Sequence, residues 1–158
     1  MTKTELYTQL LPQITSLLQG ETDPVANMAN LSAVLYHNLP QINWAGFYVL
    51  RGDELVLGPF QGKPACVRLK RGRGVCWAAA EKHQTVIVPD VHAFAGHIAC
   101  DSASQSEIVV PILKRTEVWG VLDIDSPVKA RFDETDKAFL EQAVNIFATA
   151  AFARSKQI

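Results

Sequence analysis

The stretch that decides the fold is SEIVVPILKRTEVWGVLDID, residues 106–125. Residues 106–113 and 118–125 are rich in β-branched and other apolar side chains, and the polar residues 114–117 separate them. Apolar runs of this length around a short polar break are typical of two strands joined by a turn. This stretch therefore predicts a pair of central strands in an antiparallel sheet.

The segments on either side of this pair predict helices at both ends of the chain. Apolar residues recur at helical spacing in residues 4–20 and 24–38, and a final helix begins at Asp133. The elements predicted between them are a hairpin of residues 42–50 and 54–57, a strand at 65–69, a helix at 74–83 and a strand at 85–88. This order predicts an α+β domain in which helices cover one face of the sheet and a ligand pocket lies on the other.

Length and charge limit the classes of function. The chain has 158 residues with 48% hydrophobic residues, which predicts one globular domain over residues 1–158. Its formal net charge of -1 argues against general binding to nucleic acid or to an anionic membrane. Glu5 interrupts the region where a signal peptide would be apolar, so we expect a cytoplasmic protein.

Three cysteines are the first candidates for chemistry. Cys66, Cys76 and Cys100 are ten and then 24 residues apart, so there is no pair at the spacing of a zinc knuckle or a thioredoxin-type motif. Their odd number predicts at least one free thiol. A cytoplasmic cysteine is often only a small buried apolar residue, and that alternative stays open for each of them.

Cys100 lies in a long segment without clear periodicity, residues 89–106. Loops of this length in a compact domain commonly serve as lids or binding loops. A thiolate is the reactive form of cysteine, so Cys100 with His97 nearby is a candidate nucleophile. His92 and His97 are equally explained as ordinary loop histidines, and we assign them no catalytic role.

Three carboxylates interrupt the two central strands. Asp123 and Asp125 are two residues apart, so they point to the same face of a strand, and Glu107 lies in the other strand. Like charges among apolar neighbours raise the pKa of a carboxyl group, which favours a proton donor at neutral pH. The alternative for each acid is a strand end that hydrogen-bonds to a turn.

Trp44 and Tyr48 are four residues apart in a predicted strand and therefore share a face. An aromatic wall beside carboxylates suits a small ligand with an apolar part and a charged amine, although core packing explains two aromatic residues equally well. The basic residues of segment 68–73 surround Gly72 without the spacing of a phosphate-binding loop, so we interpret them as a solvated turn.

Six segments of the sequence together resemble one family. They are NWAGFY at residues 43–48, LGPFQGKPAC at 57–66, GVC at 74–76, GHIACDSAS at 96–104, SEIVVP at 106–111 and GVLDIDS at 120–126. These motifs resemble those of the free methionine-(R)-sulfoxide reductases, which are built on a GAF domain. The resemblance implies a GAF-like fold and a homodimer.

The resemblance also implies roles for individual residues. Cys100 matches the catalytic cysteine, Cys66 the principal resolving cysteine and Cys76 an auxiliary thiol. The matches in the substrate pocket are Trp44 and Tyr48 as aromatic residues, and Glu107, Asp123 and Asp125 as the carboxylates that hold the substrate amine and assist protonation of the sulfoxide oxygen. The chain departs from the family pattern at Trp77, where glycine is expected, and at Ala95, where proline is usual.

The expected activity is reduction of free L-methionine (R)-S-oxide to L-methionine by sulfenic acid and disulfide chemistry. Asp125 is the first candidate for the proton donor, while the order in which Cys66 and Cys76 act is left open. We expect no bound cofactor or metal, and thioredoxin, with NADPH and thioredoxin reductase, as the external reductant. The alternatives are a non-catalytic GAF sensor of small molecules and a zinc site formed by Cys66, Cys76, Cys100 and His97.

Overall fold

The computed structural model describes residues 1–96 and 102–153. Within them the sheet has six strands in the order β3-β2-β1-β6-β5-β4, and each neighbouring pair is antiparallel. The strands are β1 (Trp44–Arg51), β2 (Glu54–Gly62), β3 (Arg68–Lys70), β4 (Val86–Val88), β5 (Ser106–Lys114) and β6 (Glu117–Ser126). The helices are α1 (Lys3–Leu18), α2 (Pro24–Asn38), α3 (Gly74–Lys82) and α4 (Glu134–Ala151), and Val91–Ala93 forms the short 3-10 helix η1.

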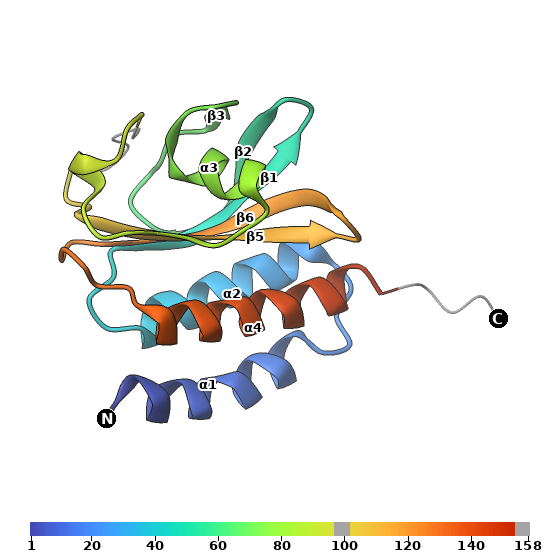
Figure 1. Ribbon diagram of the computed structural model, residues 1–158. Helices are drawn as coiled ribbons and strands as arrows, with labels where there is room; N and C mark the ends of the chain where they lie inside the picture. The colour runs from blue at the N-terminus through green and yellow to red at the C-terminus, as the bar shows by residue number, and fades with distance from the viewer. Residues whose placement is uncertain (97–101, 154–158) are drawn as a thin grey trace.

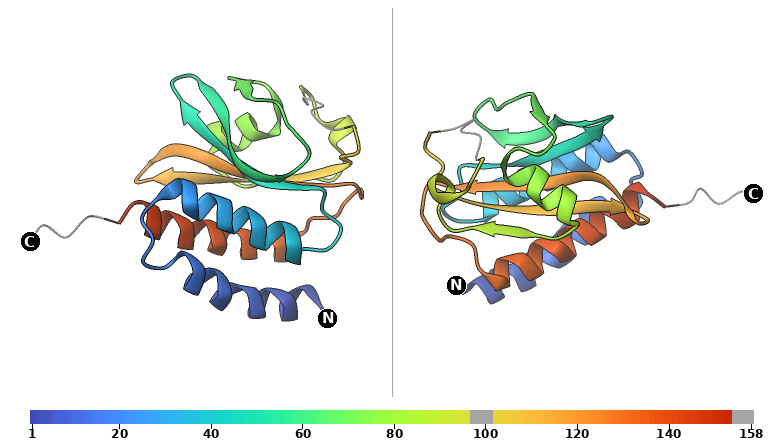
Figure 2. Two further views of the ribbon diagram at one scale, coloured as in Figure 1. Left: turned by 180° about the vertical axis from the view of Figure 1, so that it is seen from behind. Right: turned by 45° about the horizontal axis from the view of Figure 1, so that its top comes forward.

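The helices lie in layers on the two faces of this sheet. In Figure 1, α2 and α4 pack directly beneath the sheet, and α1 forms a further layer below them. Figure 2 shows α3 on the opposite face, together with the curled hairpin end of β2 and β3. The predicted α+β architecture with terminal helices on one face is therefore confirmed, and α3 is the helix that covers part of the pocket face.

The two faces of the sheet carry two separate clusters of buried residues. The cluster on the helix side of the sheet is the larger one, and it includes side chains with no exposed surface, such as Phe47, Ile124 and Phe147. The smaller cluster on the opposite face contains Trp44, Tyr48 and the buried residues of α3. Alternation along β1 and β6 sends neighbouring residues to different clusters, so the same strands stabilise the helix layer and line the pocket.

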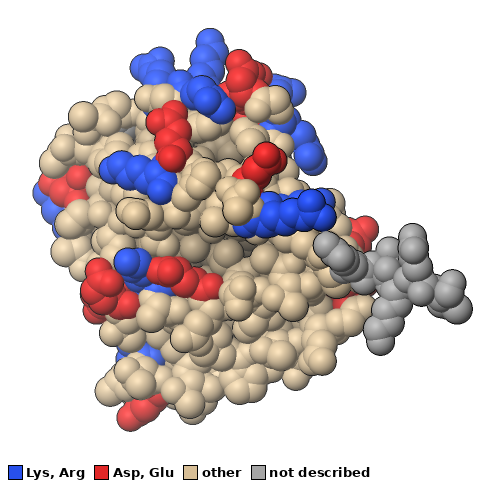
Figure 3. Space-filling model, turned by 45° about the vertical axis from the view of Figure 1, so that its right-hand side comes forward, with Lys and Arg blue, Asp and Glu red and all other residues tan. Residues whose placement is uncertain are grey.

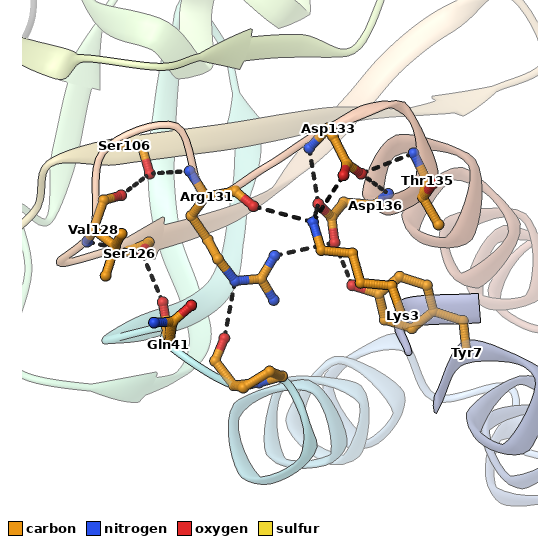
Figure 4. A network of polar contacts seen from close by, with 11 residues as sticks. Lys3, Tyr7, Gln41, Ser106, Ser126, Val128, Arg131, Asp133, Thr135 and Asp136 are labelled. Carbon is orange, nitrogen blue, oxygen red and sulfur yellow. Dashed lines mark hydrogen bonds and ion pairs between the residues drawn. The ribbon is translucent and has the colours of Figure 1, made fainter. Parts of the chain in front are cut away.

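A buried carboxylate at the start of α4 ties several segments together, as Figure 4 shows. Asp136 is fully buried and accepts hydrogen bonds from the Tyr7 hydroxyl, from Arg131 Nη1 at 3.1 Å and from Lys3 Nζ at 2.6 Å. The pKa of Tyr7 is raised by its burial and by the Asp136 charge beside it. This network joins α1 to the segment that leads into α4, where Asp133 caps the helix.

The same network reaches the ends of the central strands. The Arg131 backbone N–H donates to Ser106 Oγ at 3.4 Å, and the Ser106 hydroxyl donates to the Val128 carbonyl at 2.5 Å. On the neighbouring strand, the Ser126 hydroxyl donates to the Gln41 carbonyl at 2.6 Å (Figure 4). Ser106 and Ser126 are partners in the register of β5 and β6. These contacts therefore anchor the start of β5 and the end of β6, which lie side by side.

Two of the predicted elements differ from the structure. The hairpin of β1 and β2 is longer than predicted, because β2 continues to Gly62. The strand predicted at residues 65–69 is wrong in its first three residues, since β3 begins at Arg68. Pro64 has no backbone N–H, and the Cys66 carbonyl accepts a hydrogen bond from the Tyr48 side chain. The segment before β3 therefore lies over the pocket and not in the sheet.

The network around Asp136 leads to a prediction about stability. Replacing Asp136 with asparagine removes the buried charge that faces Arg131 and Lys3, so the free energy of unfolding should fall by about 3–5 kcal/mol. The matched control is Glu134→Gln in the same helical turn, whose side chain is 85% exposed. It should change stability by less than about 0.5 kcal/mol. Urea unfolding of the reduced proteins, followed by circular dichroism, measures both, and equal stabilities of the two variants would contradict the prediction.

Candidate active site

Three carboxylates form the floor of a cavity on the face of the sheet that carries α3. The register of β5 and β6 pairs Glu107 with Asp125 and Val109 with Asp123, so the three acids project from the same face. Glu107 and Asp123 are buried, and Asp125 is half-buried. The sequence prediction that Asp123 and Asp125 share a face is confirmed, and the register adds Glu107 to that face.

Burial and mutual repulsion control the protonation of this floor. The pKa of Glu107 is raised well above its usual range, first by burial and then by the charges of Asp123 and Asp125. The pKa of Asp123 is also raised by burial, while hydrogen bonds from Glu107 and Cys76 oppose that shift. The floor therefore retains protons at pH values at which exposed carboxylic acids have already released them.

Cys76 approaches this floor from α3. Cys76 is 4% exposed, and its Sγ lies within 4.8 Å of carboxylate oxygens of Glu107 and Asp123. Burial and the nearby acidic side chains raise the pKa of the thiol well above its usual range. A thiol that resists ionisation is a poor nucleophile, so Cys76 is not suited to start the reaction.

Aromatic side chains form one wall of the cavity. Trp44 stacks on Tyr48 with ring centroids 6.0 Å apart, and it also stacks on Phe60 at 5.2 Å. Burial, followed by the charge of Asp123, raises the pKa of the Tyr48 hydroxyl, which stays neutral. The predicted aromatic wall is thus present, and it lies beside the carboxylate floor.

The polar ends of the same two aromatic residues hold the segment that carries Cys66. Trp44 Nε1 donates a hydrogen bond to the Lys63 carbonyl at 3.1 Å, and the Tyr48 hydroxyl donates to the Cys66 carbonyl at 2.9 Å. Because buried indole and phenol groups need such partners, these bonds fix the position of residues 63–66 over the cavity. Cys66 is half-buried and disulfide-bonded, whereas Cys76 is free.

The cavity has a volume of about 50 Å³, enough for a few water molecules. Its lining comprises Trp44, Tyr48, Lys63, Pro64, Ala65, Leu69, Arg73, Gly74, Val75, Cys76, Ser104, Glu107, Asp123 and Asp125. Six predicted site residues are therefore brought together, while Cys66 lies next to the lining residue Ala65. Cys100, the predicted nucleophile, and His97 lie outside the described residues, and His92 is exposed in η1.

A model of the GAF domain matches residues 13–151. The chain is also 54% identical, over 144 residues, to the protein named free methionine-R-sulfoxide reductase in Escherichia coli K12, covering 91% of this chain and 87% of that one. The chain belongs to the free methionine-R-sulfoxide reductases of the GAF domain family. The predicted family is therefore confirmed.

Solved structures of this reductase family share the fold. The free methionine-R-sulfoxide reductase of Neisseria meningitidis, solved in complex with its substrate, has a TM-score of 0.93 and 48% identity, with 96% of this chain and 91% of that chain covered. The reduced form of fRMsr from Staphylococcus aureus has a TM-score of 0.89 and 52% identity, with coverage of 92% and 94%. The GAF fold is thus shown by sequence and by structure.

Several lining residues of this GAF pocket were missed by the sequence analysis. Arg73 belongs to the basic segment that was interpreted as a solvated turn, and Lys63 had no signal of its own. Lys and Arg side chains gather over the end of the molecule that β2 and β3 form (Figure 3). Arg73, just before α3, lines the cavity together with Lys63. The motif GKPAC would have indicated Lys63 only through the family resemblance.

Two residues outside the lining help to position the elements that form the reductase pocket. Gly46 faces Asp123 across the β1–β6 register, and a Cβ there would clash with Phe60 and lie 2.8 Å from the Trp44 ring. Trp77, where the family pattern has glycine, is 2% exposed, and its Nε1 donates to the Leu69 carbonyl at 2.7 Å. Trp77 therefore fastens α3 to β3 and lies outside the lining of the cavity.

None of the helices in the described residues has the length and apolar character that crossing a membrane requires.

The raised pKa of Glu107 predicts how stability depends on pH. Between the ordinary pKa of glutamate and the raised value, the folded protein keeps a proton that the unfolded chain releases. The free energy of unfolding should therefore fall as pH rises through this window. Glu107→Gln removes this loss and should be more stable than the parent at neutral pH by about 0.5–2 kcal/mol.

Urea unfolding of the reduced proteins between about pH 5 and pH 8 measures this difference. The control is Glu117→Gln at the exposed start of β6, which should keep the slope of the parent. A Glu107→Gln variant with the same slope as the parent would show that Glu107 titrates normally.

Proposed function

We propose that this chain reduces free methionine-R-sulfoxide to methionine. The observation that carries the proposal is a buried acidic floor next to an aromatic wall, with the segment that carries Cys66 tied to that wall. An identity of 54% to a reductase of that name supports the same conclusion. A GAF sensor requires neither redox-active thiols nor this tether, so these features favour the reductase over a GAF sensor.

The lining of the cavity matches a free amino acid with two charged ends. The ammonium group of the substrate meets Glu107, Asp123 and Asp125, and its apolar carbons lie against the rings of Trp44 and Tyr48. The cationic side chains of Lys63 and Arg73 at the cavity suit the substrate carboxylate. A methionine within a peptide lacks both charges, so this arrangement selects the free amino acid.

Cys100 is the proposed nucleophile. Its thiolate attacks the sulfoxide sulfur while an acid in the floor protonates the sulfoxide oxygen. The resulting hydroxyl group then moves from the substrate sulfur to the Cys100 sulfur as the bond between the two sulfur atoms breaks, so methionine leaves and Cys100 is oxidised to a sulfenic acid. The high pKa of Cys76 supports this choice by making that thiol a poor candidate for the first attack.

Cys66 is the proposed resolving residue. Its thiol condenses with the sulfenic acid of Cys100, and the products are a disulfide and water. The disulfide-bonded state of Cys66 and the free thiol of Cys76 support this order of use. Thioredoxin then reduces the disulfide by dithiol exchange and is itself recycled by thioredoxin reductase with NADPH.

Asp125 is the proposed proton donor to the sulfoxide oxygen. It pairs with both Trp44 and Glu107 in the sheet, and it is less buried than Asp123. Protons retained by Glu107 and Asp123 replenish it, because the three acids repel one another when all are ionised. Residues 1–158 act as a single domain in this scheme. The homodimer and the cytoplasmic location stay predictions.

The cysteine roles lead to a test by turnover. Cys100→Ser should abolish methionine formation from free methionine-R-sulfoxide. Cys66→Ser should release about one equivalent of methionine per protein and then stop, because its sulfenic acid has lost the principal resolving thiol. The assay follows NADPH oxidation in the presence of thioredoxin and its reductase, and methionine is quantified separately.

The S epimer and a peptide-bound sulfoxide are the substrate controls for this assay. Full turnover by Cys100→Ser would remove Cys100 from the mechanism. No methionine from any substrate, with the thiols confirmed reduced, would leave the chain as a GAF sensor.

The roles of the acids are separable by steady-state kinetics. Asp125→Asn should lower kcat by about 10²–10⁴-fold with a smaller change in KM, because it removes the proton donor. Asp123→Asn should act mainly on KM, because that carboxylate holds the ammonium group. The reverse pattern of kcat and KM effects in these two variants would assign the proton transfer to Asp123.

A further inference from the structure

Three ligand-type side chains meet at one point of the cavity floor. The Sγ atom of Cys76 and one carboxylate oxygen each of Glu107 and Asp123 all lie within 4.8 Å of one another. The residues come from α3, β5 and β6, and they are only 4%, 6% and 5% exposed. A soft sulfur ligand and two hard oxygen ligands are therefore held together from three separate elements.

An independent observation indicates that this cluster lacks a positive partner. Asp123 Oδ1 is buried and has no hydrogen-bond partner among the described residues, although Asp123 lines the cavity. Within the same part of the chain, no lysine or arginine forms an ion pair with Glu107 or Asp123. A buried carboxylate oxygen without a donor is costly, and a bound cation would remove that cost.

The mixture of ligands selects the kind of cation. Zn²⁺ and Cd²⁺ bind thiolate and carboxylate together, whereas Mg²⁺ and Ca²⁺ prefer sites made of oxygen atoms alone. Ligand bonds of about 2.0–2.3 Å require the three side chains to draw slightly closer around Zn²⁺. The ion would displace the proton of the Cys76 thiol to solvent, and a water in the cavity would complete a tetrahedral arrangement.

We propose that Cys76, Glu107 and Asp123 form a binding site for a thiophilic divalent cation such as Zn²⁺. An ion in this site occupies the carboxylates that hold the substrate ammonium group, so cation and substrate exclude one another. This second statement rests on the proposed reductase function, whereas the binding site does not. The ligand set also differs from the zinc site considered from the sequence, because it needs neither Cys66, Cys100 nor His97.

Binding is tested on a protein in which Cys76 is the one remaining thiol, the Cys66→Ser/Cys100→Ser variant. Titration with Cd²⁺ should produce the ultraviolet thiolate-to-cadmium absorption band and saturate at about one equivalent. Adding Cys76→Ser or Cys76→Ala should abolish the band, while Mg²⁺ should not compete. Glu107→Gln and Asp123→Asn in the same background should each weaken Cd²⁺ binding at least about tenfold.

Glu117→Gln in that background is the matched control, because this acid is exposed and far from the cavity floor, and its Cd²⁺ affinity should be unchanged. Circular dichroism spectra and melting curves establish that each variant is folded. Absence of the band in the folded protein, or an affinity that ignores both carboxylate substitutions, would overturn the site.

Exclusion of substrate is tested separately by single turnover, which avoids the zinc-sensitive thiols of the thioredoxin system. Zn²⁺ should suppress methionine release by pre-reduced Cys66→Ser protein, competitively with methionine-R-sulfoxide and reversibly on chelation. The Cys66→Ser/Cys76→Ser variant should be at least about tenfold less sensitive. Equal sensitivity of the two would overturn the exclusion. Absence of turnover without metal would contradict the reductase function and leave the Cd²⁺ result standing.

Discussion

The register between β5 and β6 is the constraint on which the rest of the structure depends. It places Glu107, Asp123 and Asp125 on one face, while Ile108 and Ile124 point to the other and are fully buried against the helices. A slip of one residue would turn the acids into the apolar layer and expose the isoleucines to the cavity. The large apolar layer therefore enforces the position of the carboxylates.

This division between the two faces explains how the protein tolerates a crowded acidic site. Groups that repel one another in a buried cavity lower stability, and such a cost is common where binding or catalysis needs it. The opposite face offsets the cost through its apolar cluster and through the network of Asp136 with Lys3, Tyr7 and Arg131. Because that network also reaches Ser106, it holds the strand end next to Glu107.

The aromatic wall connects the binding part of the site to its redox part. The rings of Trp44 and Tyr48 line the cavity, while their polar atoms hold the segment that carries Cys66. A change in the position of this segment would therefore be transmitted directly to the wall that contacts the ligand. Cys76 lies on α3, where the adjacent residue Trp77 anchors the helix to β3. The Cys76 thiol lies close to the carboxylates of Glu107 and Asp123.

The amino-acid sequence alone determined the elements of the sheet and much of the candidate site. Strand periodicity was sufficient to place Asp123 with Asp125, and Trp44 with Tyr48, because residues separated by two or four positions share a face. The same reasoning indicated terminal helices on one side of the sheet. The family resemblance supplied the roles of the three cysteines, which periodicity cannot assign.

Only the tertiary structure decided which segments meet at the cavity. The approach of Cys76 to Glu107 and Asp123 depends on how α3 packs across β5 and β6, and no local pattern encodes that distance. Lys63, in the β2–β3 connection, and Arg73, in the β3–α3 connection, both line the cavity, whereas the sequence suggests an ordinary solvated turn for the segment that contains Arg73. The sequence also placed the start of β3 too early, because the tertiary hydrogen bond from the Tyr48 hydroxyl to the Cys66 carbonyl outweighs local strand propensity there.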